Sequence, residues 1–144
     1  MTSTTSRWGR AGRDVTGIGR VLIVEDNDDL RMLLADVLDD AGFEVQAVGN
    51  GAEALEVARA WRPSAIVLDL MMPVMDGPAF LKERLETPWL SAVPVLVLTA
   101  HPFHHRVLEG LAPTAVVRKP YDVEELIAAV QALCKGETGR CLVR

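Results

Sequence analysis

With 144 residues, the chain is long enough for one domain with a proper core and too short for two domains of ordinary size, so we expect no separate output domain. Hydrophobic residues make up 49% and charged residues 24%, which excludes global disorder, and no apolar run approaches the roughly 20 residues of a membrane-spanning helix. The net charge is −5, and residues 20–135 alone carry −8, which argues against nucleic acid or an anionic membrane as a partner.

Both ends of the chain are predicted to lie outside the domain. Residues 1–19 are rich in Ser, Thr, Gly and Arg and have no hydrophobic stretch of secretory length, so we expect a disordered leader. Residues 136–144 are expected to form a flexible tail. The two cysteines, Cys134 and Cys141, make no metal or disulfide framework and do not indicate an oxidising compartment. We therefore expect a domain at 20–135 and a cytoplasmic location.

Five short apolar segments within this domain are predicted to be strands. In chain order they are 21–25, 43–48, 65–69, 93–99 and 114–118. The first, third and fourth are almost entirely apolar, which is expected where both faces of a strand are covered, so these three should be central. The second is more mixed and suits an edge of the sheet.

Amphipathic segments at helical spacing connect these strands. The first helix is predicted from about Leu30 to a stop at Gly42, and the second opens near Asn50. The third contains Phe80, and the last follows Asp122, a residue type suited to the N-cap. Residues 101–113 carry a proline near each end and a glycine inside, so at most two turns of helix are expected there.

This alternation predicts an α/β fold of the flavodoxin-like, doubly wound type, a three-layer α/β/α sandwich whose five-stranded parallel sheet has the order 2-1-3-4-5. Sheets of this kind bind ligands beyond the carboxyl ends of their strands, where strand one meets strand three. Polar side chains stand at these ends: Glu25, Asp26, Asp69, Thr99 and Lys119. One such residue would be an ordinary turn former, but their convergence on one edge predicts a functional site.

The residue types at this edge point to phosphoryl chemistry. Carboxylates about 5 Å apart repel each other by roughly 3 kcal/mol at an effective dielectric near 20, so Glu25, Asp26 and Asp69 should hold a cation, and their hard oxygens suit Mg²⁺. A carboxylate can also attack phosphorus and become an aspartyl phosphate. Phosphoryl transfer needs mainly positioning and charge neutralisation, which a metal and Lys119 supply, while Thr99 offers a hydroxyl donor.

At the same positions the sequence resembles the receiver domains of bacterial two-component systems, over essentially all of residues 20–135. The matching segments are VLIVEDN at 21–27, VLDLMMPVMDG at 67–77, VLVLTA at 95–100 and VRKPY at 117–121. The resemblance implies that Asp69 accepts a phosphoryl group from a sensor histidine kinase or a phosphotransfer protein. It implies a signalling switch with no enzymatic activity beyond its own phosphorylation and dephosphorylation.

The resemblance also implies roles for particular residues of these segments. Mg²⁺, or Mn²⁺ in its place, would be held by Glu25 through water and directly by Asp26, Asp69 and the backbone carbonyl of Met71. The phosphoryl group would contact Lys119, Thr99 and Ala100. Loop shape would depend on Pro73, Gly77 and Pro120, with the peptide bond before Pro120 in the cis form.

Two features depart from the commonest pattern of this family. Val116 stands three residues before the lysine, where most relatives have Tyr or Phe, and the segment between Thr99 and Lys119 is about two residues short. Both lie on the surface that relatives use for signalling. Met71 and His101 occupy positions that influence how fast water removes the phosphoryl group, and methionine cannot orient an attacking water, so we expect slow self-dephosphorylation, over minutes or longer.

These departures keep two functions open. In the first, the domain is a phosphorylation-dependent switch that signals to an unknown downstream protein, as a monomer or as a weak homodimer through the face of strands four and five. In the second, it is an interaction module that keeps the receiver fold but is not controlled by phosphorylation. The intact acceptor, acids, threonine and lysine favour the first.

Overall fold

The computed structural model describes residues 19–70, 77–100, 104–135 and 142–143. Its strands are β1 (Arg20–Val24), β2 (Glu44–Val48), β3 (Ala65–Asp69), β4 (Val95–Thr99), β5 (Ala115–Arg118) and β6 (Leu142–Val143). Its helices are α1 (Asp28–Asp40), α2 (Gly51–Trp61), α3 (Gly77–Leu85), α4 (Pro88–Ser91), α5 (His104–Val107) and α6 (Val123–Cys134). All five predicted strands are present, with ends that differ by two residues at most.

The strands form one parallel sheet in the order β2-β1-β3-β4-β5-β6. This confirms the predicted order 2-1-3-4-5, with β2 at an edge. The sixth strand was not predicted and lies in the segment expected to be a tail. Leu142 pairs with Ala115 and Val143 pairs with Val116. Two residues are too few to give a strand pattern in a sequence.

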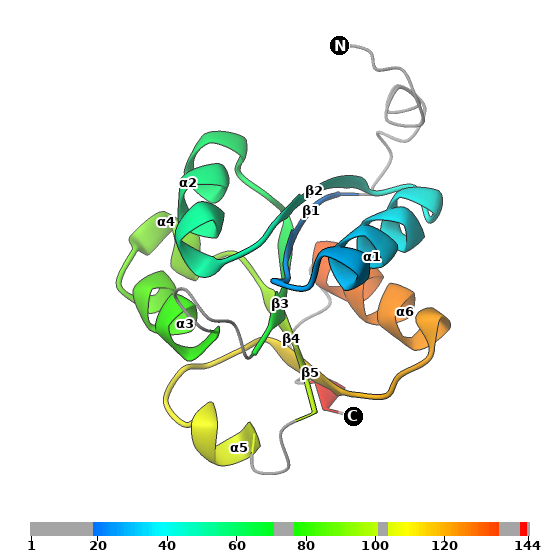
Figure 1. Ribbon diagram of the computed structural model, residues 1–144. Coiled ribbons are helices and arrows are strands. Elements are labelled where there is room, and N and C mark those ends of the chain that lie inside the picture. The colour runs from blue at the N-terminus through cyan, green and yellow to red at the C-terminus, as the bar shows by residue number, and fades with distance from the viewer. Residues whose placement is uncertain (1–18, 71–76, 101–103, 136–141, 144) are drawn as a thin grey trace.

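Helices cover both faces of the sheet, as the three-layer prediction requires. Figure 1 shows α1 and α6 on one side and α2, α3, α4 and α5 on the other. Alternate strand residues enter the two cores: Val21 and Ile23 pack with α1 and α6, whereas Leu22 and Val24 pack with α2 and α3. These four residues of β1 are fully buried. Burial of both faces explains why β1, β3 and β4 are so apolar.

The helix ends follow from local capping chemistry. The side chains of Asn27 and Asn50 accept hydrogen bonds from the third residue beyond each cap and so begin α1 and α2. Asp122 is the N-cap of α6 as expected, but its side chain makes no capping hydrogen bond. Gly42 follows the end of α1 with a positive φ of 106°, a conformation that glycine adopts without strain.

The weak helix expected between β4 and β5 is the four-residue α5. Helix α4 was not predicted, because four residues cannot show a helical period, although Pro88 stands at its start, where proline is favoured. Within the described part of the chain, no helix has the length and apolar character needed to cross a membrane.

Candidate functional site

The carboxyl ends of the strands bring the predicted polar residues to one edge of the sheet. Glu25 follows β1, Asp69 ends β3, Thr99 ends β4, and Lys119 follows β5 directly. The Lys119 N–H donates to the Thr99 carbonyl at 2.8 Å, which ties the ends of β4 and β5 together. The order of the strands, rather than proximity in sequence, therefore creates the site.

Three carboxylates meet at this edge. One oxygen from each of Glu25, Asp26 and Asp69 lies within 4.8 Å of the others. Glu25 is 2% exposed and Asp69 8% exposed, whereas Asp26 faces solvent. The Lys119 ammonium lies 3.4 Å from Asp69 Oδ1. Two buried acids, one exposed acid and one cation thus share a small volume.

Glu25 is held firmly but is electrostatically strained. Its Oε2 accepts the Asn27 N–H at 3.1 Å, while its buried Oε1 has no hydrogen-bond partner among the described residues. Burial, together with the neighbouring Asp69 carboxylate, raises the pKa of Glu25 to about 7, against the lowering effects of the Asn27 N–H and Lys119. A group in this state gains from a proton or a metal ion.

The donor set fits a hard divalent cation. Oxygens bound to one Mg²⁺ at about 2.1 Å are about 3 Å apart when adjacent and about 4 Å apart when opposite. The carboxylate oxygens of the three acids lie within 4.8 Å of one another. A small side-chain movement, or one water between a carboxylate and the ion, would bring them to these separations. The acidic cluster of Glu25, Asp26 and Asp69 can therefore bind a divalent metal. Binding would also compensate the buried Glu25 Oε1, which has no hydrogen-bond partner among the described residues.

The loop after β3 starts with a close backbone contact. The Gly77 N–H donates to the Leu70 carbonyl at 2.9 Å, and a Cβ on Gly77 would lie only 2.4 Å from that oxygen. Only glycine fits at this point. Met71 and Pro73 of the same loop, like His101 after β4, lie outside the described residues.

The remaining predicted residues that the structure describes lie on, or just after, β4 and β5. Thr99 is buried, whereas Ala100, the next residue, is exposed. The Lys119–Pro120 peptide bond is cis, as the resemblance implied. Val116 is buried in the core that includes Val97.

Two residues near the site were not singled out from the sequence. The pKa of the Tyr121 phenol is raised by burial and then by the charges of Glu25 and Asp69, so the phenol is within electrostatic range of the acidic cluster. Its position directly after the lysine and proline was the available signal. The second is Arg31, whose guanidinium donates to the backbone carbonyl of Glu25 at 3.0 Å. A cation in the first turns of a helix, where the helix dipole disfavours it, could have drawn attention to it.

Comparison with known proteins agrees with this geometry. The family model for the response regulator receiver domain matches residues 21–131. The DNA-binding response regulator MtrA of Mycolicibacterium smegmatis is 36% identical over 115 residues, which cover 78% of this chain and 49% of MtrA. The chain spans about half the length, or less, of the curated relatives that it matches.

Solved structures give the same result. The chemotaxis protein CheY4 of Vibrio cholerae has a TM-score of 0.75 and 31% identity, and the match covers 81% of this chain and 98% of CheY4. The receiver domain of the sensor histidine kinase PA1611 from Pseudomonas aeruginosa PAO1 has a TM-score of 0.75 and 28% identity, with 81% of this chain and 98% of that domain covered. That structure holds a magnesium ion coordinated in its active-site cleft.

Proposed function

This chain belongs to the response regulator receiver domain family of two-component signalling, and from that premise we propose that it is a switch operated by phosphorylation of Asp69. Receiver domains are signalling switches rather than enzymes in the ordinary sense. The observation that carries the proposal is the juxtaposition of Asp69 with two further carboxylates and with the ammonium of Lys119 at 3.4 Å.

The proposed reaction is a phosphoryl transfer to the Asp69 carboxylate. One of its oxygens attacks phosphorus and forms a P–O bond, while the bond between phosphorus and the donor breaks and its electron pair leaves with the donor. For a phosphohistidine donor, the leaving group is an imidazole, which then takes up a proton. Asp69 is 8% exposed, so only a small part of its side chain is open to a donor.

A divalent ion, which we propose to be Mg²⁺ or Mn²⁺, would neutralise the charge that develops on the phosphoryl oxygens. Glu25, Asp26, Asp69 and the backbone carbonyl of Met71 would hold it, with Glu25 acting through water. The magnesium in the cleft of the PA1611 receiver supports this choice. Lys119, whose ammonium lies 3.4 Å from Asp69 Oδ1, would supply further positive charge.

Once the phosphoryl group is attached, we propose that it recruits further contacts. The new group carries up to about −2 charge. Lys119, which pairs with the unmodified Asp69, would then bind a phosphoryl oxygen, and the Thr99 hydroxyl and the Ala100 N–H would donate to others. Thr99 ends β4, and its carbonyl accepts the Lys119 N–H. A movement of Thr99 would therefore also shift the backbone at the end of β5.

Loss of the phosphoryl group is proposed to be slow. Met71 and His101, which lie outside the described residues, are assigned this role from the sequence alone. A thioether cannot hold a water molecule in line with phosphorus. We expect phosphorylated protein to last for minutes or longer, and a phosphate-release assay that gave a lifetime of seconds would contradict this assignment.

The proposed partners are proteins. A sensor histidine kinase or a phosphotransfer protein would supply the phosphoryl group, and a downstream protein would read the altered surface around β4 and β5, with the domain acting as a monomer or a weak homodimer through that face. The charge of −8 on residues 20–135 argues against direct contact with nucleic acid. Because phosphohistidine donors are made from ATP, we place the exchange in the cytoplasm.

A second candidate is an interaction module that does not respond to phosphorylation. Val116 favours it, since this small side chain is buried in the core with Val97 and Leu108 and offers no aromatic ring that could change its position. The two candidates differ in one measurement. Metal-free protein is incubated with acetyl phosphate, with or without Mg²⁺, and its intact mass is recorded.

A phosphorylation switch gains the mass of one phosphoryl group only when Mg²⁺ is present, and the Asp69→Asn variant gains none. The matched control is Asp36→Asn, which alters an exposed carboxylate of α1 and should be modified at the wild-type rate. Equal absence of modification in wild type and Asp69→Asn would support the interaction module instead.

A further inference from the structure

The loop that carries Glu25 and Asp26 is fixed by contacts outside the acidic cluster. The Glu25 N–H donates to the Val48 carbonyl of β2 at 3.0 Å, so this N–H continues the hydrogen bonding of the sheet. Its carbonyl lies beyond the end of β1 and is bound instead by Arg31 at 3.0 Å. The carboxylate is bound by the Asn27 N–H. Arg31 thus brings a side chain of α1 to the backbone of this loop.

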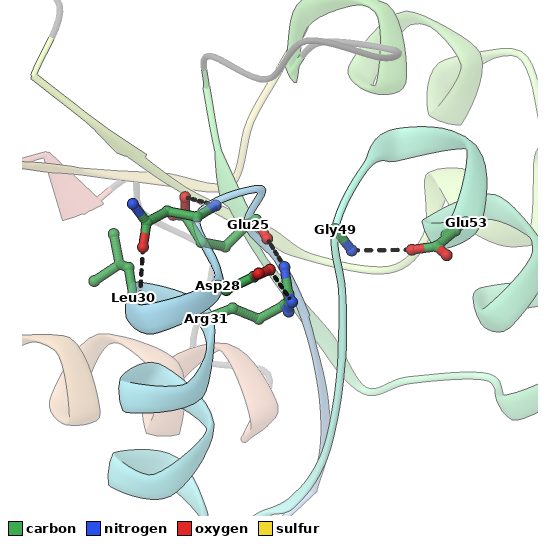
Figure 2. Close-up of polar contacts among 7 residues, drawn as sticks. Glu25, Asp28, Leu30, Arg31, Gly49 and Glu53 are labelled. Atoms are coloured by element: carbon green, nitrogen blue, oxygen red, sulfur yellow. Dashed lines mark hydrogen bonds and ion pairs between the residues drawn. The ribbon is translucent and has the colours of Figure 1, made fainter.

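Arg31 is itself held in place on α1. Its backbone N–H donates to the Asn27 carbonyl at 2.8 Å, and its guanidinium forms an ion pair with Asp28 one turn earlier. The Arg31 side chain is 24% exposed and that of Asp28 is 80% exposed. The guanidinium is thus the inner partner of the pair. Figure 2 shows the contacts of the guanidinium with Asp28 and with Glu25.

The next loop of the sheet packs against the same guanidinium. A Cβ on Gly49, which follows β2, would lie 3.3 Å from an Arg31 nitrogen. The Gly49 N–H donates to Glu53 of α2 at 3.0 Å, and Glu53 in turn donates its backbone N–H to Asn50 at 2.9 Å. Figure 2 includes the first of these contacts. The Arg31 guanidinium therefore lies next to both the loop after β1 and the loop after β2.

From these contacts we infer that Arg31 is a positioning residue for the metal site, which sets the position of Glu25 and Asp26 through the Glu25 carbonyl. The inference rests on the proposed function, because it concerns the affinity of the same acidic cluster for a divalent ion. Groups that orient metal-binding residues without touching the metal typically contribute 10- to 100-fold to affinity. Arg31 touches none of the reacting atoms.

Positioning and simple electrostatics predict opposite results when Arg31 is replaced. A cation beside an acidic cluster repels a metal ion, so loss of its charge alone would make Mg²⁺ bind more tightly. Loss of the contact with the Glu25 carbonyl would instead release the loop and weaken binding. The direction of the change in the dissociation constant therefore separates the two effects.

The test compares four forms of the full chain by calorimetric titration with Mg²⁺, and by the paramagnetic resonance signal of free Mn²⁺. Arg31→Met keeps the aliphatic stem, and Arg31→Lys keeps the charge with a single donor group. The control Arg59→Met removes one positive charge from the exposed end of α2. We expect the dissociation constant to rise about tenfold or more in Arg31→Met, less in Arg31→Lys, and to stay near wild type in the control.

A second readout needs no metal. In metal-free protein, amide hydrogen exchange at Asn27, whose N–H is bound by the Glu25 carboxylate, should be faster in Arg31→Met than in wild type. An unchanged or lower dissociation constant in Arg31→Met, with wild-type exchange at Asn27, would overturn the inference alone. A wild-type protein that binds neither Mg²⁺ nor Mn²⁺ would overturn the proposed metal site and the inference with it.

Discussion

Replacement of Glu25 by glutamine should stabilise the metal-free protein at neutral and alkaline pH, although it removes a group proposed to serve the metal. Burial, followed by the nearby Asp69 carboxylate, raises the pKa of Glu25 from its ordinary value of 4.5 to about 7. The folded protein therefore holds this proton more tightly than the unfolded chain does. Its contribution to stability is fully present below pH 4.5 and is lost as the pH rises through about 7.

The size of the effect follows from the two pKa values. Each tenfold change in acidity corresponds to about 1.4 kcal/mol, so a pKa that moves from 4.5 to about 7 implies at most about 3 kcal/mol. Glu25→Gln keeps the shape of the protonated acid and does not ionise. In chelator-containing buffer it should exceed wild type by up to this amount at pH 8, and the difference should disappear near pH 4.5.

Urea unfolding of both proteins between pH 4 and pH 9 measures this difference directly, and Glu56→Gln, which alters an exposed carboxylate of α2, is the matched control. Excess Mg²⁺ should largely cancel the difference at pH 8, since a ligand at 100 times its dissociation constant adds about 2.7 kcal/mol, and wild type has the better site. A Glu25→Gln protein that is less stable than wild type without metal at pH 8 would show that ionised Glu25 does not destabilise the fold.

Three further substitutions test other contacts of the site and of the core. Lys119→Met should slow phosphorylation by acetyl phosphate about 10²-fold or more, as loss of a charge-stabilising donor does, yet tighten Mg²⁺ binding, and a wild-type time course by intact mass would contradict it. Gly77→Ala should lower the free energy of unfolding by about 2 kcal/mol or more, because its Cβ would lie 2.4 Å from the Leu70 carbonyl oxygen. The control Gly110→Ala, in open space at a φ of +79°, should lower it by about 1 kcal/mol. Equal losses in urea unfolding would show that the contact with Leu70 is unimportant. Arg84→Met should lower stability by about 3 kcal/mol, because this buried side chain donates to three backbone carbonyls that would lose their partner; a loss under 1 kcal/mol on denaturation would count against it.

The strands and their order were predictable because burial on both faces leaves a direct signal in the sequence. Residues 21–24 and 65–68 are uninterrupted apolar runs, and the structure buries all of them fully. The acidic cluster followed from the same signal, since the parallel order of the strands decides which polar residues share an edge. The helix start at Asn50 was also predictable, because an asparagine N-cap acts through its own side chain on the next turn of the helix.

Other features depend on contacts that no local pattern records. Helix α4 and strand β6 are too short to show a period. The sequence places Arg31 in the first turns of a helix, but only the fold shows that its guanidinium reaches the Glu25 carbonyl. Arg84 is buried against backbone carbonyls, whereas burial of arginine is rarely expected without an acidic partner. Such roles arise when loops from distant parts of the chain meet.

Under the proposed function, Asp69 itself receives a phosphoryl group in a metal-dependent reaction. Borohydride reduces an aspartyl phosphate to homoserine, which peptide mass spectrometry identifies at a single position. After incubation with acetyl phosphate, homoserine should be found at Asp69 when Mg²⁺ is present and should be absent when the metal is chelated. Homoserine at another aspartate, or an unreduced Asp69 in a sample shown by intact mass to carry the phosphoryl group, would contradict the account.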